Sequence, residues 1–139
     1  MSATHTGGCL CGAVRYAATG EPRWIAHCHC RSCRKHTGSV VSTSAGFVRE
    51  HIAFTGAAPG RYASSPGIVR SFCTRCGTPL AYESEARAAE IDILLGTLDD
   101  PQDFPPTLQV WTEERLPWLH IDEHLPRYPK TPRNSRREG

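Results

Sequence analysis

The sequence lacks a long hydrophobic run: none of its apolar stretches approaches the roughly 18 residues needed to span a bilayer. Residues 1–8 contain neither a basic start nor an apolar stretch, so we expect no secretory signal. We therefore expect a cytoplasmic protein, or one in another reducing compartment, and no membrane partner.

The chain also lacks a large excess of one charge, since it has 16 basic and 14 acidic residues. The basic charge is nevertheless concentrated at the C-terminal end, where Glu138 alone opposes Arg127, Lys130, Arg133, Arg136 and Arg137. The preceding part of the chain is slightly acidic, so nucleic acid would have to bind this tail, and we do not expect it as a partner. We predict that residues 127–139 form a disordered, basic tail rich in Pro and Arg.

The number of cysteines is odd, whereas a complete disulfide framework requires an even number. The seven cysteines form three tight groups, C-L-C, C-H-C-R-S-C and C-T-R-C-G. Reducing compartments keep thiols reduced, and such clustering is typical of metal sites. The pattern therefore indicates a zinc protein.

The first and last groups together predict one closed zinc site. In a strand, Cys9 and Cys11 would point to the same face. Two intervening residues allow a tight turn at Cys73 and Cys76, and Gly77 supplies the backbone freedom that such a turn needs. Four thiolates complete the tetrahedral set of a structural zinc ion.

The middle group, Cys28, Cys30 and Cys33, offers three sulfurs within six residues. Three protein ligands with one open position are typical of catalytic zinc, and the open position can take water or a thiolate. A histidine could instead close this site, with three candidates at His27, His29 and His36. The spacing also leaves open a pairing of the first group with part of the middle group.

The remaining pattern predicts a mainly β protein, with residues 1–126 forming a single small domain. We expect about eight short strands, over residues 9–17, 24–29, 39–47, 51–55, 68–72, 79–82, 91–98 and 108–112. A helical turn is expected over 31–36, ended by Gly38, and a short helix over 116–124.

Four passages resemble the glutathione-dependent formaldehyde-activating enzyme family, which includes the animal centromere protein V. They are G-G-C-L-C-G-A-V-R-Y from Gly7, H-C-H-C-R-S-C-R-K-H-T-G-S from His27, R-S-F-C-T-R-C-G-T-P-L from Arg70, and L-P-W…L-P-R-Y-P from Leu116. The resemblance implies stacked short antiparallel sheets (β-tent-like). It also implies two zinc ions: a structural one on Cys9, Cys11, Cys73 and Cys76, and a catalytic one on Cys28, Cys30 and Cys33.

The resemblance further implies a carbon–sulfur lyase that joins formaldehyde to glutathione as S-hydroxymethylglutathione. Three cations beside the middle group could offset thiolate charge and hold the carboxylates of the thiol: Arg31, Arg34 and Lys35. The chain departs from the family pattern at Gln109, where many relatives carry a histidine. Two alternatives follow: a non-catalytic two-zinc module that contacts nucleic acid or protein through its basic tail, or a zinc hydrolase with another substrate.

Overall fold

The computed structural model describes residues 3–132, which form two compact units. Within these residues, the first unit comprises residues 3–23 and 45–104, and the second comprises residues 24–44 and 105–132. The prediction of a mainly β protein is confirmed, whereas a single domain over residues 1–126 stays a prediction. No helix in residues 3–132 has the length and apolar character needed to cross a bilayer.

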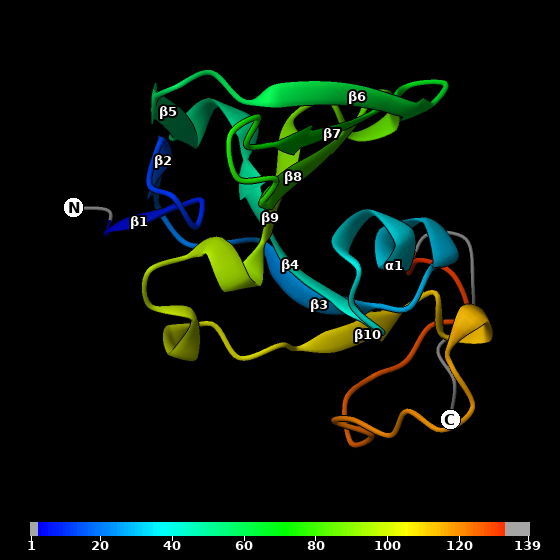
Figure 1. The fold of residues 1–139 in the computed structure, drawn as a ribbon. Helices are drawn as coiled ribbons and strands as arrows, with labels where there is room; N and C mark the ends of the chain where they lie inside the picture. Colours follow the sequence, from blue (N-terminus) through cyan, green and yellow to red (C-terminus); the bar gives the residue numbers. More distant parts are fainter. Residues whose placement is uncertain (1–2, 133–139) are drawn as a thin grey trace. The chain divides into compact units, whose positions relative to one another are not determined.

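The first unit contains a three-stranded antiparallel sheet in the order β1-β2-β5 (Figure 1). Its strands are β1 (Thr4–Gly8), β2 (Val14–Thr19) and β5 (Ile52–Gly56). Strand β1 was not predicted because its polar, glycine-containing sequence has no apolar alternation. Gly7 is required there, since a Cβ atom at this position would lie 2.3 Å from the Tyr16 hydroxyl.

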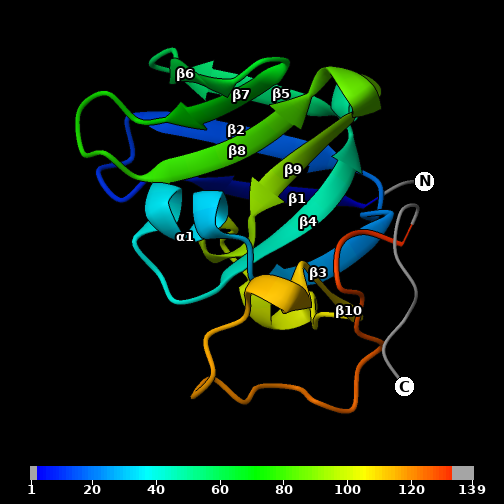
Figure 2. The ribbon, with the colours of Figure 1, turned by 90° about the vertical axis from the view of Figure 1, so that its right-hand side faces the viewer.

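A second antiparallel arrangement in this unit runs in the order β9-β8-β7-β6 (Figure 2). Its strands are β6 (Gly60–Ser65), β7 (Ile68–Phe72), β8 (Pro79–Ser84) and β9 (Glu90–Leu94). We predicted β7, β8 and β9 but not β6, which pairs with β7 although polar and small residues fill it.

Buried side chains from both arrangements form the core of the first unit. The first unit also contains four short 3-10 helices, η1 (Arg49–His51), η2 (Glu85–Arg87), η3 (Leu95–Thr97) and η4 (Pro101–Asp103). Strand β4 (Ser42–Val48) begins in the second unit and ends in the first, where it contributes Ala45 and Phe47 to the core. The largest fully buried apolar side chains here are Phe47, Leu80, Ile93 and Val14.

The second unit contains a parallel pair of strands, β3 (Trp24–Cys28) and β10 (Leu108–Val110). Helix α1 (Arg31–Thr37) follows β3 directly and ends at Gly38, as the sequence predicted. A 3-10 helix, η5 (Thr112–Glu114), follows β10.

The chain beyond β10 returns to this strand. The Gln109 backbone N–H donates to the Pro126 carbonyl, and the Tyr128 N–H donates to the Gln109 carbonyl. The predicted tail is therefore hydrogen-bonded to the second unit where it begins, while residues 133–139 lie outside the described residues. The helix predicted over residues 116–124 is wrong: turns replace it, and Asp122 adopts a φ of 41°, which no α-helix accepts.

Candidate metal centres

The four-cysteine group of the first unit is built from two turns. Cys9 and Cys11 lie in the turn between β1 and β2, where the Gly12 N–H donates to the Cys9 carbonyl at 3.1 Å. The turn brings the two sulfurs together. The prediction that they share one face of a strand is therefore wrong. Leu10 between them is 89% exposed.

The second turn follows β7 and carries Cys73 and Cys76, as the C-x-x-C-G spacing predicted. The Gly77 N–H donates to the Cys73 carbonyl at 2.8 Å, and Gly77 adopts a φ of 81° that favours glycine. The backbone N–H groups of Arg75 and Cys76 both point at the Cys73 sulfur, at 3.4 Å. Such donors stabilise a thiolate.

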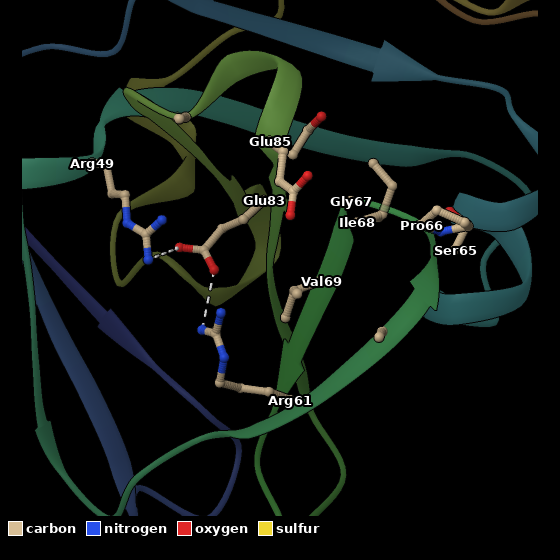
Figure 3. Close-up of a pocket in the computed structure, with 12 residues that line it drawn as sticks. Arg49, Arg61, Ser65, Pro66, Gly67, Ile68, Val69, Glu83 and Glu85 are labelled. Carbon is tan, nitrogen blue, oxygen red and sulfur yellow. Dashed lines mark ion pairs between the residues drawn. The ribbon is translucent and has the colours of Figure 1, made fainter.

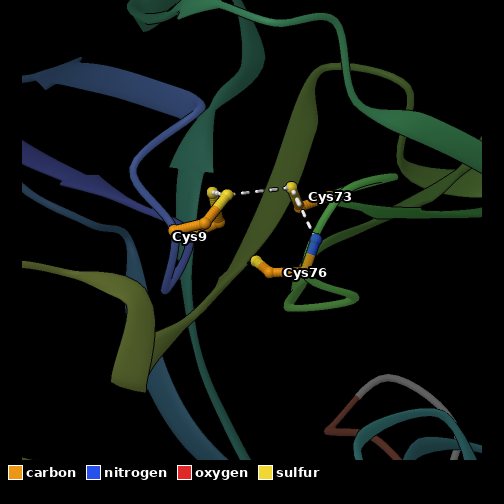
Figure 4. A group of neighbouring side chains, drawn as sticks. Cys9, Cys73 and Cys76 are labelled. Carbon is orange, nitrogen blue, oxygen red and sulfur yellow. Dashed lines mark hydrogen bonds between the residues drawn. The ribbon is translucent and has the colours of Figure 1, made fainter.

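The four sulfurs have the spacing of a tetrahedral zinc site. All lie within 4.8 Å of one another, with 3.6 Å between Cys9 and Cys11 and 3.8 Å between Cys11 and Cys73 (Figure 4). Four sulfurs at 2.3 Å from a central zinc ion would lie about 3.8 Å apart. Hydrogen bonds from Thr78, first from its hydroxyl, lower the pKa of Cys76 to about 5. This donor set fits zinc.

The three-cysteine group of the second unit lies where β3 passes into α1. Cys28 ends the strand, Cys30 is the N-cap of the helix, and Cys33 lies in its first turn. The Cys28 and Cys33 sulfurs are 3.7 Å apart, and the Cys33 backbone N–H donates to the Cys30 sulfur at 3.2 Å. All three sulfurs lie within 4.8 Å of one another, so one ion can contact all of them.

The electrostatics of this group also fit a metal cation. Its contacts with Cys30 and Cys33, together with burial, raise the pKa of Cys28 well above its usual range. Three thiolates this close repel one another, and a divalent cation among them removes that repulsion.

Two of the three candidate histidines, His27 and His29, contact side chains of other segments. The third, His36, lies in α1 outside the three-cysteine group. The ring nitrogens of His27 lie 2.8 Å from the Thr43 hydroxyl and 2.7 Å from an Asp122 carboxylate oxygen. His29 is fully buried, and its Nε2 lies 2.7 Å from Gln109 Oε1. Within residues 3–132, the group contains the three sulfurs and no histidine nitrogen. This arrangement favours three protein ligands over a site closed by histidine.

The three predicted cations all lie on α1. Arg31 and Lys35 are exposed, whereas Arg34 is half-buried and its buried Nε has no hydrogen-bond partner within the described chain. Arg34 follows Cys30 by four residues, so both lie on the same side of the helix. The Arg31 backbone N–H donates to a Glu114 carboxylate oxygen at 2.8 Å.

Gln109 has a role that the sequence did not indicate. Its side chain is buried, accepts from His29 and donates to the carbonyls of Ile121 and Asp122 at 2.9 and 3.0 Å. The Gln109 oxygen is an acceptor here, so His29 Nε2 carries the proton. No local pattern links partners 80 residues apart.

Comparisons with known proteins identify a family, a curated relative and a similar fold. Residues 4–114 match the glutathione-dependent formaldehyde-activating enzyme family. An uncharacterized lyase of Schizosaccharomyces pombe is 32% identical over 78 residues, which are 56% of each chain, so the match spans about half of that curated relative. A crystal structure of a Rhodobacter sphaeroides protein superposes with a TM-score of 0.56 and 21% identity, over 70% of this chain and 93% of the other. The last likeness shows a shared fold.

The family match covers most of the chain and includes all seven cysteines. The protein therefore belongs to the glutathione-dependent formaldehyde-activating enzyme family.

Proposed function

We propose that the protein is a zinc-dependent carbon–sulfur lyase that forms or cleaves the adduct of glutathione, or another small thiol, with a small electrophile such as formaldehyde. The reaction would take place at Cys28, Cys30 and Cys33. The observation that carries this proposal is the three-sulfur group without a histidine nitrogen, in a chain of this family. The lyase name of the Schizosaccharomyces pombe relative supports the reaction class.

Zinc bound by the three sulfurs would supply a Lewis acid with an open position, which lowers the pKa of an arriving thiol. The protein's own contribution is to hold the three sulfurs together. Cys30 is fixed as the helix N-cap by the Cys33 N–H, and Cys28 is fixed by the pairing of β3 with β10.

The cations on α1 would bind the glutathione carboxylates. Arg34 is the strongest candidate, because its half-buried side chain lies on the same side of α1 as Cys30. Arg31 and Lys35 are exposed and would add long-range attraction for an anionic thiol. The group Cys9, Cys11, Cys73 and Cys76 would hold the structural zinc ion, since four sulfurs leave no open position.

The test is the rate at which formaldehyde and glutathione exchange with their hydroxymethyl adduct, measured by NMR exchange spectroscopy. We expect wild-type protein to raise this rate above the uncatalysed rate and Cys30→Ser to abolish the increase. Arg34→Leu should raise the KM for glutathione with a smaller effect on kcat. An exchange rate that wild-type protein leaves unchanged would contradict the formaldehyde reaction, and an active Cys30→Ser would contradict the assigned site.

A further inference from the structure

The first unit carries a hollow of about 550 Å³ that neither cysteine group uses (Figure 3). Its floor is one face of the β6-β7-β8 arrangement, where Ala63, Val69 and Glu83 are direct cross-strand neighbours. Ala63 and Val69 give this floor a small apolar surface, with charged side chains around it.

One side of the hollow carries an ion triad. The Glu83 side chain is only 10% exposed, and its two oxygens lie 3.1 Å from nitrogens of Arg49 and Arg61 (Figure 3). Each guanidinium uses one nitrogen in these ion pairs and is about half exposed, so further N–H donors face solvent. The triad carries a net charge of +1, which favours an anionic group.

Glu85 also lines the hollow, beside the turn at Gly67. It is exposed, and within residues 3–132 its carboxylate has neither a hydrogen bond nor an ion pair. The Glu85 carboxylate is therefore an acceptor for an N–H group that the described residues do not supply.

We propose that this hollow binds a small zwitterion with an aliphatic body, such as an amino acid or a short peptide. The ligand carboxylate takes the free donors of Arg49 and Arg61, and its ammonium group lies against Glu85. Two arginines and two glutamates make the hollow neutral overall while separating its charges. A neutral zwitterion gains attraction at both ends, whereas an ion of one sign is repelled at one of them.

The experiment uses the dipeptide alanylalanine as the probe, titrated into ¹⁵N-labelled full-length protein. Amide signals of Val69 and Glu83 should shift saturably. N-acetyl-alanylalanine lacks the ammonium group and alanylalanine amide lacks the carboxylate, so each should bind about tenfold more weakly, as expected for the loss of a charge-assisted hydrogen bond.

Matched variants test which residue binds the ammonium group of the ligand and which binds its carboxylate. Glu85→Gln should weaken alanylalanine about tenfold and leave the N-acetyl analogue unchanged. Arg61→Gln should weaken alanylalanine to a similar extent and leave the amide analogue unchanged. The control is Glu50→Gln, an exposed residue outside the hollow, which should bind as wild type does.

The inference does not depend on the proposed lyase reaction, because no cysteine lines the hollow. The same titration in Cys30→Ser should therefore give the same affinity. Absence of saturable shifts at tens of millimolar alanylalanine would overturn it. Equal binding of all three compounds, or unchanged binding in both Glu85→Gln and Arg61→Gln, would overturn it as well.

Discussion

His29 Nε2 lies 2.7 Å from Gln109 Oε1, and this contact joins the end of β3 to β10 beside the three-cysteine group. The amide nitrogen of Gln109 donates to the carbonyls of Ile121 and Asp122, so one buried side chain connects three segments. His29 stands between Cys28 and Cys30 in the sequence. Gln109 is thus placed to hold the backbone that carries these two sulfurs.

We expect Gln109→Leu to lower the free energy of unfolding by about 2–4 kcal/mol. The substitution leaves the His29 N–H and the Ile121 carbonyl without a partner, while the Asp122 carbonyl keeps the Leu125 N–H as a donor. Each buried unsatisfied group costs about 1–3 kcal/mol. Urea unfolding with zinc present measures the change. Gln102→Leu on the exposed η4 is the control and should alter stability by less than about 0.5 kcal/mol. A Gln109→Leu protein as stable as this control would contradict the role of the network.

The turn and the helix that carry the cysteines could be predicted from the sequence, because residues close together in the chain determine each of them. The C-x-x-C-G motif predicted the turn at Gly77, and the basic stretch ended by Gly38 predicted α1. The resemblance that these motifs supported is confirmed by the family match.

Long-range pairing could not be predicted in this way. Strands β1 and β6 lack apolar alternation and become strands through their neighbours β2 and β7. A short helix was predicted over residues 116–124, but Asp122 takes a left-handed conformation and its carbonyl accepts from Gln109. This hydrogen bond joins residues 13 positions apart, and no local sequence pattern predicts it.

We predict that Cys76→Ala is unfolded or insoluble. Structural zinc contributes apparent binding free energies of about 10–16 kcal/mol in finger peptides, which matches or exceeds a typical domain stability of about 5–15 kcal/mol. The four-cysteine group also joins turns more than sixty residues apart, so its loss frees much of the first unit. Expression in the soluble fraction and thermal melting test this prediction. A soluble variant that melts at the wild-type temperature would refute the structural role.

Cys30→Ser should fold and contain about one zinc ion per chain, whereas wild type should contain about two. The three-cysteine group spans six residues, so its ion closes only a short local loop. Elemental analysis of protein purified without added metal, together with thermal melting, provides both readouts. A ratio near one in wild type would show that the three-cysteine group holds no permanent ion.

The buried pair of Asp92 and Arg87 should make stability depend on pH. Burial raises the pKa of Asp92 to about 6, although hydrogen bonds from Arg87 oppose the shift. The folded protein thus binds a proton that the unfolded chain has already lost, so stability falls as pH rises between the unfolded pKa near 4 and the folded one.

Between pH 5.5 and 7.5, wild type should lose about 1 kcal/mol more stability than Asp92→Asn, which has no carboxyl group to titrate. Urea unfolding of both proteins at the two pH values measures this difference, and the titration of the cysteines cancels in the comparison. A constant difference in stability, or an Asp92 carboxyl signal that titrates near pH 4 in NMR, would contradict the raised pKa.

The central claim is that the group Cys28, Cys30 and Cys33 is a metal site with room for an external thiol. The most direct measurement is the absorption spectrum of cobalt-substituted protein during titration with glutathione, because a new sulfur ligand adds sulfur-to-cobalt charge-transfer absorption. We predict that wild type gains this absorption with glutathione and not with S-methylglutathione, and that Cys30→Ser gains none with either. No spectral change in wild type at millimolar glutathione would contradict the claim and favour a module without a thiol site.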